Sequence, residues 1–227
     1  IVIMRDTDEY SGIIESTFDK YNVPAYINKK TDFLTKPLAL FILNLIEMSI
    51  YGIEYDLLFS YLKTGLSQIP QDDVALLENY ASLWGITGKK WYSDWNMSIY
   101  GYVDRELSEE DKLQNVKTLE KINEIRKKVI IPIDTFIKKV NNETVEKICK
   151  LIYEHIEAVN VKRGIVDSSE IFIKTNQTKL LKEQQQIYDI CIDALDQLAL
   201  IYKNEKTNIK NFYEILKIIL RKSKIKT

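Results

Sequence analysis

The fold is decided first by the stretch PLALFILNLIEMSIY, residues 37–51. Its proline suits the first turn of an α-helix, because the first amides of a helix need no partner within it. Apolar side chains recur here at the spacing of one helix face: Leu38, Phe41, Ile42, Leu45 and Ile46. The apolar run from Phe41 to Ile50 is too short to span a membrane, and Asn44 and Glu47 interrupt it. We therefore expect a core helix and no contact with a membrane.

Helical patterns continue along most of the chain. We expect further helices over 8–21, 55–62, about 70–84, from Ser108 with an interruption near Pro132, from Asn142 or Thr144, over 180–203 and over 209–222. Gly65 and Gly85 suit helix carboxyl ends. Only 7 Gly and 4 Pro occur in 227 residues, too few for the many tight turns of a β-sandwich or barrel. The sequence predicts a mainly α fold.

The amino-terminal segment has a different pattern. Ile1 to Met4 and Val23 to Ile27 are short β-branched runs on either side of a predicted helix. We expect a small strand–helix–strand α/β portion, so residues 1–50 form a partial α/β segment and residues 51–227 a helical subdomain. Because the chain begins at Ile1 and two short strands cannot form a stable sheet, we expect it to be a piece of a longer protein.

Charge is balanced over the whole chain but not along it. The formal net charge is −1, so no global field attracts nucleic acid or membrane. From Tyr202 to Thr227, however, eight basic residues stand against two acidic ones. This end is either a solvated helix face with a charged tail or a surface that contacts phosphates.

No catalytic signature is present. His155 is the only histidine, which excludes a multi-histidine zinc site and leaves no strong Ser–His or Cys–His pair. Cys149 and Cys191 lie far apart, and we expect buried free thiols in a reducing, cytoplasmic compartment. The segment Gly85–Lys90 is glycine-rich and ends in lysine, but its spacing is not that of a phosphate-binding loop. We assign no catalytic residue.

Several motifs together resemble a known family. The strand end Met4-Arg5-Asp6, the segment Tyr21–Ile27 and Lys36-Pro37-Leu38 resemble the second RecA-like domain of UvrD-like superfamily 1 DNA helicases. The later motifs narrow the resemblance to the AddB-type subunit of the bacterial ATP-dependent helicase–nuclease that processes double-strand DNA breaks. These motifs are Phe59–Leu66, Leu77–Tyr80 and Gly85–Trp91. After Trp91 only the helical character and the order of elements are similar.

The resemblance implies a scaffold in DNA repair and recombination. Such a subunit has a helicase-like but inactivated core, a nuclease domain and an iron–sulfur cluster, and it pairs with an active helicase–nuclease subunit. Residues 1–50 would then be part of the RecA-like domain and residues 51–227 the helical subdomain inserted into it. Since no nuclease motif or cluster cysteines occur here, ATP, Mg and the cluster would be bound elsewhere, and this piece would hold no cofactor.

One departure from the family's active helicases concerns ATP. Those enzymes carry Gln-Ser-Arg early in the first helix, where the arginine reaches the γ-phosphate. The matching positions here are Glu9-Tyr10-Ser11. Without that guanidinium the transition-state charge loses a main stabiliser, so we expect no productive ATP hydrolysis.

The candidates for DNA contact are Lys63, Lys89, Lys90 and Trp91. The lysines would meet phosphates, and the indole would stack on a base. The alternative is that Trp91 packs its loop onto the helical core and the lysines are only solvated. We also expect Asn79 and Tyr80 to hold the irregular aromatic segment 85–102 by hydrogen bonds.

These observations favour a structural and DNA-contacting scaffold without catalysis of its own. Its partners would be DNA and the active helicase–nuclease subunit. Two other hypotheses stay open: a protein–protein docking module unrelated to DNA, and part of an active superfamily 1 helicase. Salt-dependent DNA binding separates the scaffold from the docking module.

Overall fold

The computed structural model describes residues 7–24, 32–102, 107–223 and 225, except for the side chains at 7–9, 11, 15, 19 and 179. The chain divides into two compact units, Ile1–Asp32 and Phe33–Thr227. The described residues form nine α-helices and two short 3₁₀ helices, without a strand. The predicted mainly α class is confirmed.

The first unit contains the helix α1, Thr7–Lys20, which confirms the helix predicted over 8–21. The predicted strand Ile1–Met4 lies outside the described residues. Most of the second predicted strand, Val23–Ile27, does too, and its described part, Val23 and Pro24, has no regular structure. The predicted strand–helix–strand arrangement is therefore not seen, because no partner strand is present in the described residues to pair with these short runs. The division at residue 50 stays a prediction.

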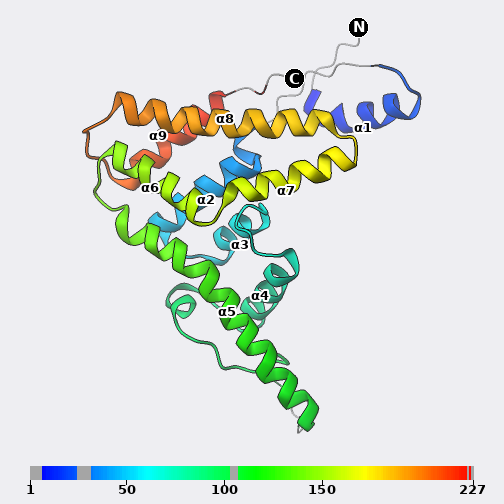
Figure 1. Cartoon of the computed structure of the whole chain (residues 1–227), viewed down its shortest axis with the longest axis vertical. Coiled ribbons are helices and arrows are strands. Elements are labelled where there is room, and N and C mark those ends of the chain that lie inside the picture. The colour runs from blue at the N-terminus through cyan, green and yellow to red at the C-terminus, as the bar shows by residue number, and fades with distance from the viewer. Residues whose placement is uncertain (1–6, 25–31, 103–106, 224, 226–227) are drawn as a thin grey trace. The chain divides into compact units, whose positions relative to one another are not determined.

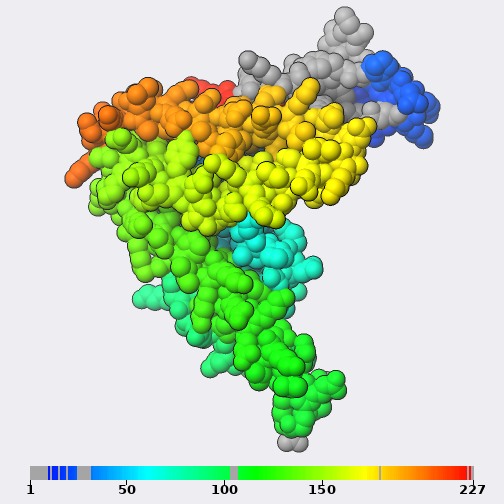
Figure 2. Space-filling model, in the orientation of Figure 1, coloured from blue at the N-terminus to red at the C-terminus, as the bar shows by residue number. Residues whose placement is uncertain are grey.

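The second unit is an assembly of eight α-helices in its described residues (Figure 1). They are α2 (Pro37–Tyr51), α3 (Tyr55–Lys63), α4 (Gln71–Leu83), α5 (Glu109–Lys139), α6 (Val145–Ala158), α7 (Val161–Lys174), α8 (Thr178–Ile201) and α9 (Ile209–Lys222), with the 3₁₀ helices η1 (Phe33–Thr35) and η2 (Gly88–Tyr92). Figure 2 shows the first turns of α5, in green, projecting beyond the other helices of this unit. None of the helices in the described part has the length and apolarity that crossing a bilayer requires.

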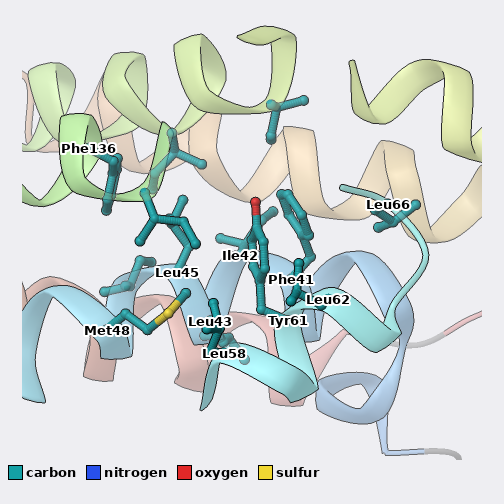
Figure 3. Close-up of a cluster of buried hydrophobic side chains, with 14 of the residues drawn as sticks. Phe41, Ile42, Leu43, Leu45, Met48, Leu58, Tyr61, Leu62, Leu66 and Phe136 are labelled. Carbon is teal, nitrogen blue, oxygen red and sulfur yellow. The ribbon is translucent and has the colours of Figure 1, made fainter. Parts of the chain in front are cut away.

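The helix α2 is the centre of the core. It begins at Pro37 as predicted and packs against α3, α5, α8 and α9. Phe41, Ile42 and Leu45 are at most 1% exposed, and α3 adds Leu58 and Leu62 to the same cluster (Figure 3). Ala39, Leu43 and Met48, which lie off the predicted stripe, are buried as well. A helix that is apolar on most of its surface needs partners on several sides, and α2 has them.

Two glycines end helices at the edge of this core, as the sequence predicts. Gly65 has a φ of +74° just after α3, and Gly85 has a φ of +54° just after α4. At the end of α4 the amide of Ile86 donates to the carbonyl of Ala81 at 2.9 Å. This bond satisfies one of the carbonyls left open at the end of α4, which is the usual role of a glycine in the left-handed region.

The long helix α5 corrects one prediction. It runs without interruption from Glu109 to Lys139, with Pro132 inside it. Ser108 caps its start by accepting a hydrogen bond from the amide of Asp111, as expected. Proline removes one backbone hydrogen bond, but the buried side chains of Ile133 and Phe136 continue the same packed face beyond it. Tertiary packing therefore holds the helix together where the local sequence favours a break.

The helix α7 was not predicted from the sequence. Its middle contains Gly164, which lowers helix propensity, and its buried side chains are few. The structure explains the glycine: a Cβ at this position would lie 3.1 Å from the carbonyl oxygen of Gly65 and 3.3 Å from the Cα of Leu66. The turn after α3 thus packs directly against the backbone of α7.

His155 lies in the core, at the junction of α3, α5 and α6. It is 4% exposed, and its Nε2 lies 2.8 Å from the hydroxyl of Tyr61. Its ring also packs beside Phe41 and Phe136. Burial lowers the pKa of His155 to about 4, while a hydrogen bond to the backbone of Pro132 raises it. Because proline has no N–H, the neutral ring must donate to that backbone, which leaves Nε2 to accept the Tyr61 proton.

We predict that Gly164→Ala lowers the free energy of unfolding by roughly 1 kcal/mol. Overpacking against the backbone near Gly65 costs about 1–3 kcal/mol, which exceeds the roughly 1 kcal/mol that alanine gains over glycine in a helix. Urea denaturation measures the change. Gly12→Ala is the matched control, because a Cβ at Gly12 would meet nothing within 4 Å. A Gly164→Ala protein as stable as the original would contradict the close packing.

We predict that His155 makes the protein less stable as the pH falls from about 6.5 to about 4. The pKa of the folded state is the lower one, so the unfolded chain binds the proton first and the folded state loses up to about 3 kcal/mol. Denaturation at several pH values measures this loss. In His155→Gln the loss of stability over this pH range should be smaller, since only the carboxylates then titrate. Equal pH profiles of the two proteins would exclude the effect.

Candidate functional site

The predicted DNA-contacting residues centre on the segment Gly85–Tyr102, here called the aromatic loop. It follows α4 and runs beside α5 in the opposite direction (Figure 1). Its hydrogen bonds show the direction, because the partners on α5 come earlier in that helix as the loop proceeds. The Trp91 carbonyl is bonded to Arg126, the Trp95 amide to Asn123, and the Ile99 amide to the side chain of Asn115. The loop is therefore attached along its length to one rigid helix.

Arg126 is the main attachment. It is 3% exposed, and its Nη1 donates to the Trp91 carbonyl at 2.8 Å while Nη2 pairs with Asp94. Its guanidinium also lies 5.6 Å from the centre of the Trp95 ring. Burial lowers the pKa of Arg126 and Asp94 raises it, and an arginine stays charged in either case. Arg126 was not among the residues predicted from the sequence, although an arginine between Ile125 and Val129 on an apolar helix face is a signal.

Trp95 is held from three sides. Its amide donates to Asn123 Oδ1 at 2.9 Å, and Asn123 Nδ2 donates back to the Trp95 carbonyl at 2.8 Å. Its indole Nε1 donates to the carbonyl of Lys90 at 2.8 Å. Its ring stacks on Tyr80 of α4, with 5.1 Å between ring centres and 13° between planes. These bonds satisfy the polar groups of a residue that is 4% exposed.

The carboxyl-terminal part of the loop is held by α4. The Tyr80 hydroxyl donates to the Met97 carbonyl at 3.0 Å, and the Trp84 Nε1 donates to the Ser98 carbonyl at 2.9 Å. The predicted role of Tyr80 is confirmed. Asn79, predicted to share it, has an exposed side chain.

Trp91 is completely buried, at 0% exposure. Its ring centre lies 6.1 Å from that of Phe59 and 5.4 Å from that of Trp95. A base stacks only on an exposed ring face, so this structure corrects the stacking role predicted for Trp91. The alternative, that Trp91 packs the loop onto the helical core, describes its position.

The three predicted lysines differ in their surroundings. Lys63 ends α3 and its Nζ lies 2.6 Å from Glu78 Oε1, so its charge is already paired. The Nζ of Lys90 donates to the carbonyl of Gly85 at 3.2 Å. Lys89 is exposed and has no ion-pair partner in the described part of the chain. The structure thus brings Lys89 and Lys90 together on η2 and ties Lys63 to an acid; their contact with DNA stays a prediction.

No group of three or more His, Cys, Asp or Glu side chains comes together as metal ligands within the described residues. Burial raises the pKa of Cys149 and of Cys191 to about 12, which keeps both thiols protonated at neutral pH. Both are buried free cysteines, as predicted.

The described basic residues of the carboxyl-terminal stretch lie on the outer face of α9 and in the turn before it, while Lys224 and Lys226 lie outside the described residues. Tyr213, Leu216 and Leu220 point into the core, and Arg221 and Lys222 are exposed. Lys217 lies over the Tyr213 ring, 5.0 Å from its centre. The position fits a solvated face and a phosphate-contacting face equally, so both interpretations stay open.

Comparison with known proteins supports part of the resemblance. No model of a protein family matches the chain. It is similar to a segment of proteins named as the B-type subunit of an ATP-dependent helicase/deoxyribonuclease. The relative from Clostridium novyi (strain NT) is 36% identical over 219 residues, covering 96% of this chain and 18% of the relative. The relative from Clostridium tetani is 34% identical, and the alignment covers 95% of this chain and 19% of the relative. The relative from Clostridioides difficile is 31% identical, and the alignment covers 95% of this chain and 18% of the relative.

The chain therefore spans about a fifth of the length of the curated relatives that it matches. The similarity extends well beyond the region up to Trp91 in which the motifs were found. The broader likeness to UvrD-like helicases stays a prediction.

We predict that Arg126→Met lowers the free energy of unfolding by about 2–3 kcal/mol, because it leaves the Trp91 carbonyl and Asp94 without their buried donor. The emission of the tryptophans should shift to the red as the loop loosens. Chemical denaturation followed by fluorescence measures both effects. Lys127→Met is the matched control: its exposed ammonium lies 3.2 Å from the same Asp94, and its loss should cost less than about 1 kcal/mol. Equal effects of the two substitutions would contradict the central role of Arg126.

Proposed function

We propose that this chain is a non-catalytic, DNA-contacting scaffold segment within the B-type subunit of an ATP-dependent helicase/deoxyribonuclease. The observation that carries the proposal is the similarity of 96% of the chain to proteins of that name, at 36% identity in one case. It extends over 219 residues, so the similarity does not rest on a single motif.

The scaffold role is supported by how the chain uses its polar groups. The side chains of Arg126, Asn123 and Tyr80 all hold backbone carbonyls of the aromatic loop. His155 and Tyr61 are buried and bonded to each other. Groups that would be candidates for chemistry in a cleft are thus engaged in holding helices and a loop together.

The DNA contact is supported by the charge of the aromatic loop. Its one acidic residue, Asp94, is paired with both Arg126 and Lys127. Lys89 and Lys90 are exposed on η2, and the loop beneath them is fixed to α5. Two cations on a rigid support, with the nearby acid neutralised, form a suitable contact for phosphates.

The rest of the proposal concerns the full-length protein. It would bind ATP, Mg and an iron–sulfur cluster outside this segment and would act with an active helicase–nuclease subunit on DNA in the cytoplasm. Residues 1–50 would belong to its RecA-like domain and residues 51–227 to an inserted helical subdomain. The positions Glu9-Tyr10-Ser11 on α1 would provide no arginine for ATP hydrolysis.

A second candidate function, a protein-docking module, is favoured by one surface. Val166, Ile171 and Ile173 on α7 are 53%, 59% and 63% exposed. Val166 also lines a groove of about 460 Å³ between α7 and α8, together with Ile165, Leu181 and Tyr188 among others, whereas Ile171 and Ile173 are not among its lining residues. Exposed apolar side chains around a groove are typical of a surface that another protein covers.

We predict that the chain binds labelled oligonucleotides with an affinity that falls as salt rises, because phosphate contacts release counterions. Lys89→Gln/Lys90→Gln should weaken binding and reduce the slope of log K against log salt by about 1–2. Fluorescence anisotropy over a salt series measures the slope. Lys150→Gln/Lys174→Gln is the control, since it removes two exposed charges from α6 and α7.

The opposing outcomes are distinct. If the original chain shows no binding at low salt, direct DNA contact is excluded and the docking module is favoured. If the two double variants lose affinity equally, binding occurs without a contribution specific to η2. ATP hydrolysis or DNA cleavage by the purified chain would contradict the non-catalytic part of the proposal.

A further inference from the structure

The three-residue turn of η2 puts one exposed aromatic residue and one exposed lysine on the same edge of this helix. A 3₁₀ helix has three residues per turn, so side chains three positions apart lie above one another. Trp91 is therefore in line with Gly88, which has no side chain, and the Trp91 ring packs into the core. Lys89 is in line with Tyr92, and both are exposed. Because the Trp91 side chain enters the core, the side chain of the next residue, Tyr92, points toward solvent.

Tyr92 combines an exposed face with a fixed position. Its side chain is 50% exposed. Burial of the remainder raises the pKa of Tyr92, Asp134 on α5 raises it further, and Lys138 lowers it. Asp134 is itself paired with Lys138, whose Nζ lies 2.5 Å from it. The phenol therefore stays neutral near pH 7, and the adjacent acid is compensated by a lysine.

The two backbone carbonyls that precede Tyr92 are both held by hydrogen bonds. The Trp91 carbonyl accepts from Arg126. The Lys90 carbonyl accepts from the Trp95 indole at 2.8 Å and from the Ser93 hydroxyl at 3.2 Å. A ring on such a support loses little further freedom when a ligand stacks on it.

We propose that Tyr92 and Lys89 form a contact site for single-stranded nucleic acid, with one unpaired base stacked on the Tyr92 ring and a neighbouring phosphate on the Lys89 ammonium. The proposal rests on the DNA-contacting function and deepens it by naming the form of the ligand and the stacking residue. A duplex offers its phosphates to Lys89, but its bases are stacked on each other and have no free face for the ring. An acidic peptide would satisfy the lysine and leave the ring unused.

The test compares the affinity of the full chain for a labelled oligothymidylate with that for a duplex of equal length. Tyr92→Ala should bind the single strand about 5- to 150-fold more weakly, the range expected for the loss of one stacked base, and should bind the duplex as the original does. Tyr92→Phe keeps the ring and should bind as the original does. Tyr51→Ala is the control, because Tyr51 is a 60% exposed tyrosine at the end of α2.

Each outcome decides the proposal. If the original chain binds DNA with salt dependence but Tyr92→Ala binds the single strand equally well, the stacking site is excluded and the proposed function stands. If the original chain binds no DNA at low salt, both are excluded. If Tyr92→Phe loses as much as Tyr92→Ala, the hydroxyl and not the ring is responsible, and the stacking site is again excluded. If polyglutamate of equal charge competes as well as the oligonucleotide, the surface is a general polyanion site and the proposal fails. Thermal melting of each variant confirms that the fold is kept.

Discussion

The burial of α2 is the constraint on which the rest of this structure depends. Its apolar side chains cover most of its circumference, so no single partner helix could remove them from water. The helices α3, α5, α8 and α9 each cover a part of it, and the last two come from the far end of the chain. A partly buried ion pair between Lys36, just before α2, and Glu183 on α8 joins the same distant segments. The chain thus folds back on itself repeatedly, so that helices from its later parts pack around α2.

Where these helices meet, the polar groups are satisfied by one another. His155 on α6 reaches the Tyr61 hydroxyl on α3 and the backbone of Pro132 on α5. In a low-dielectric interior an unpaired group would cost more than a hydrogen bond contributes, so this junction fixes how the three helices pack. The stability of the fold is therefore sensitive to acid, because the protonated His155 ring would carry a charge that water cannot reach at this buried position. The same principle applies at Arg126, whose buried charge is acceptable only because a carboxylate and a carbonyl meet it.

The parts predicted from the sequence are those that local patterns determine. The start of α2 at Pro37, the ends of α3 and α4 at glycines, and the cap of α5 at Ser108 follow from spacing and backbone chemistry. The errors concern positions where distant contacts override local preference. Pro132 stays within α5 because its buried neighbours hold the face together. The helix α7 contains Gly164 because another backbone lies against it. For Trp91 the sequence left base stacking and packing onto the core both open, and the contact with Phe59 of another helix, which supports packing, is not visible in the local sequence.

The candidate site illustrates the same relation between core and surface. The composition of the aromatic loop suggests stacking and phosphate contact, but composition alone does not say which ring is free. The three-residue turn of η2 decides it: once Trp91 enters the core, its neighbours in the turn must face elsewhere, and Lys89 and Tyr92 share one edge. Arg126 and Asn123 then keep this edge from rearranging, because they hold the carbonyl of Trp91, just before Tyr92, and that of Trp95, which follows it. A contact surface on an irregular loop therefore obtains its rigidity from α5, the longest helix in the described part of the chain.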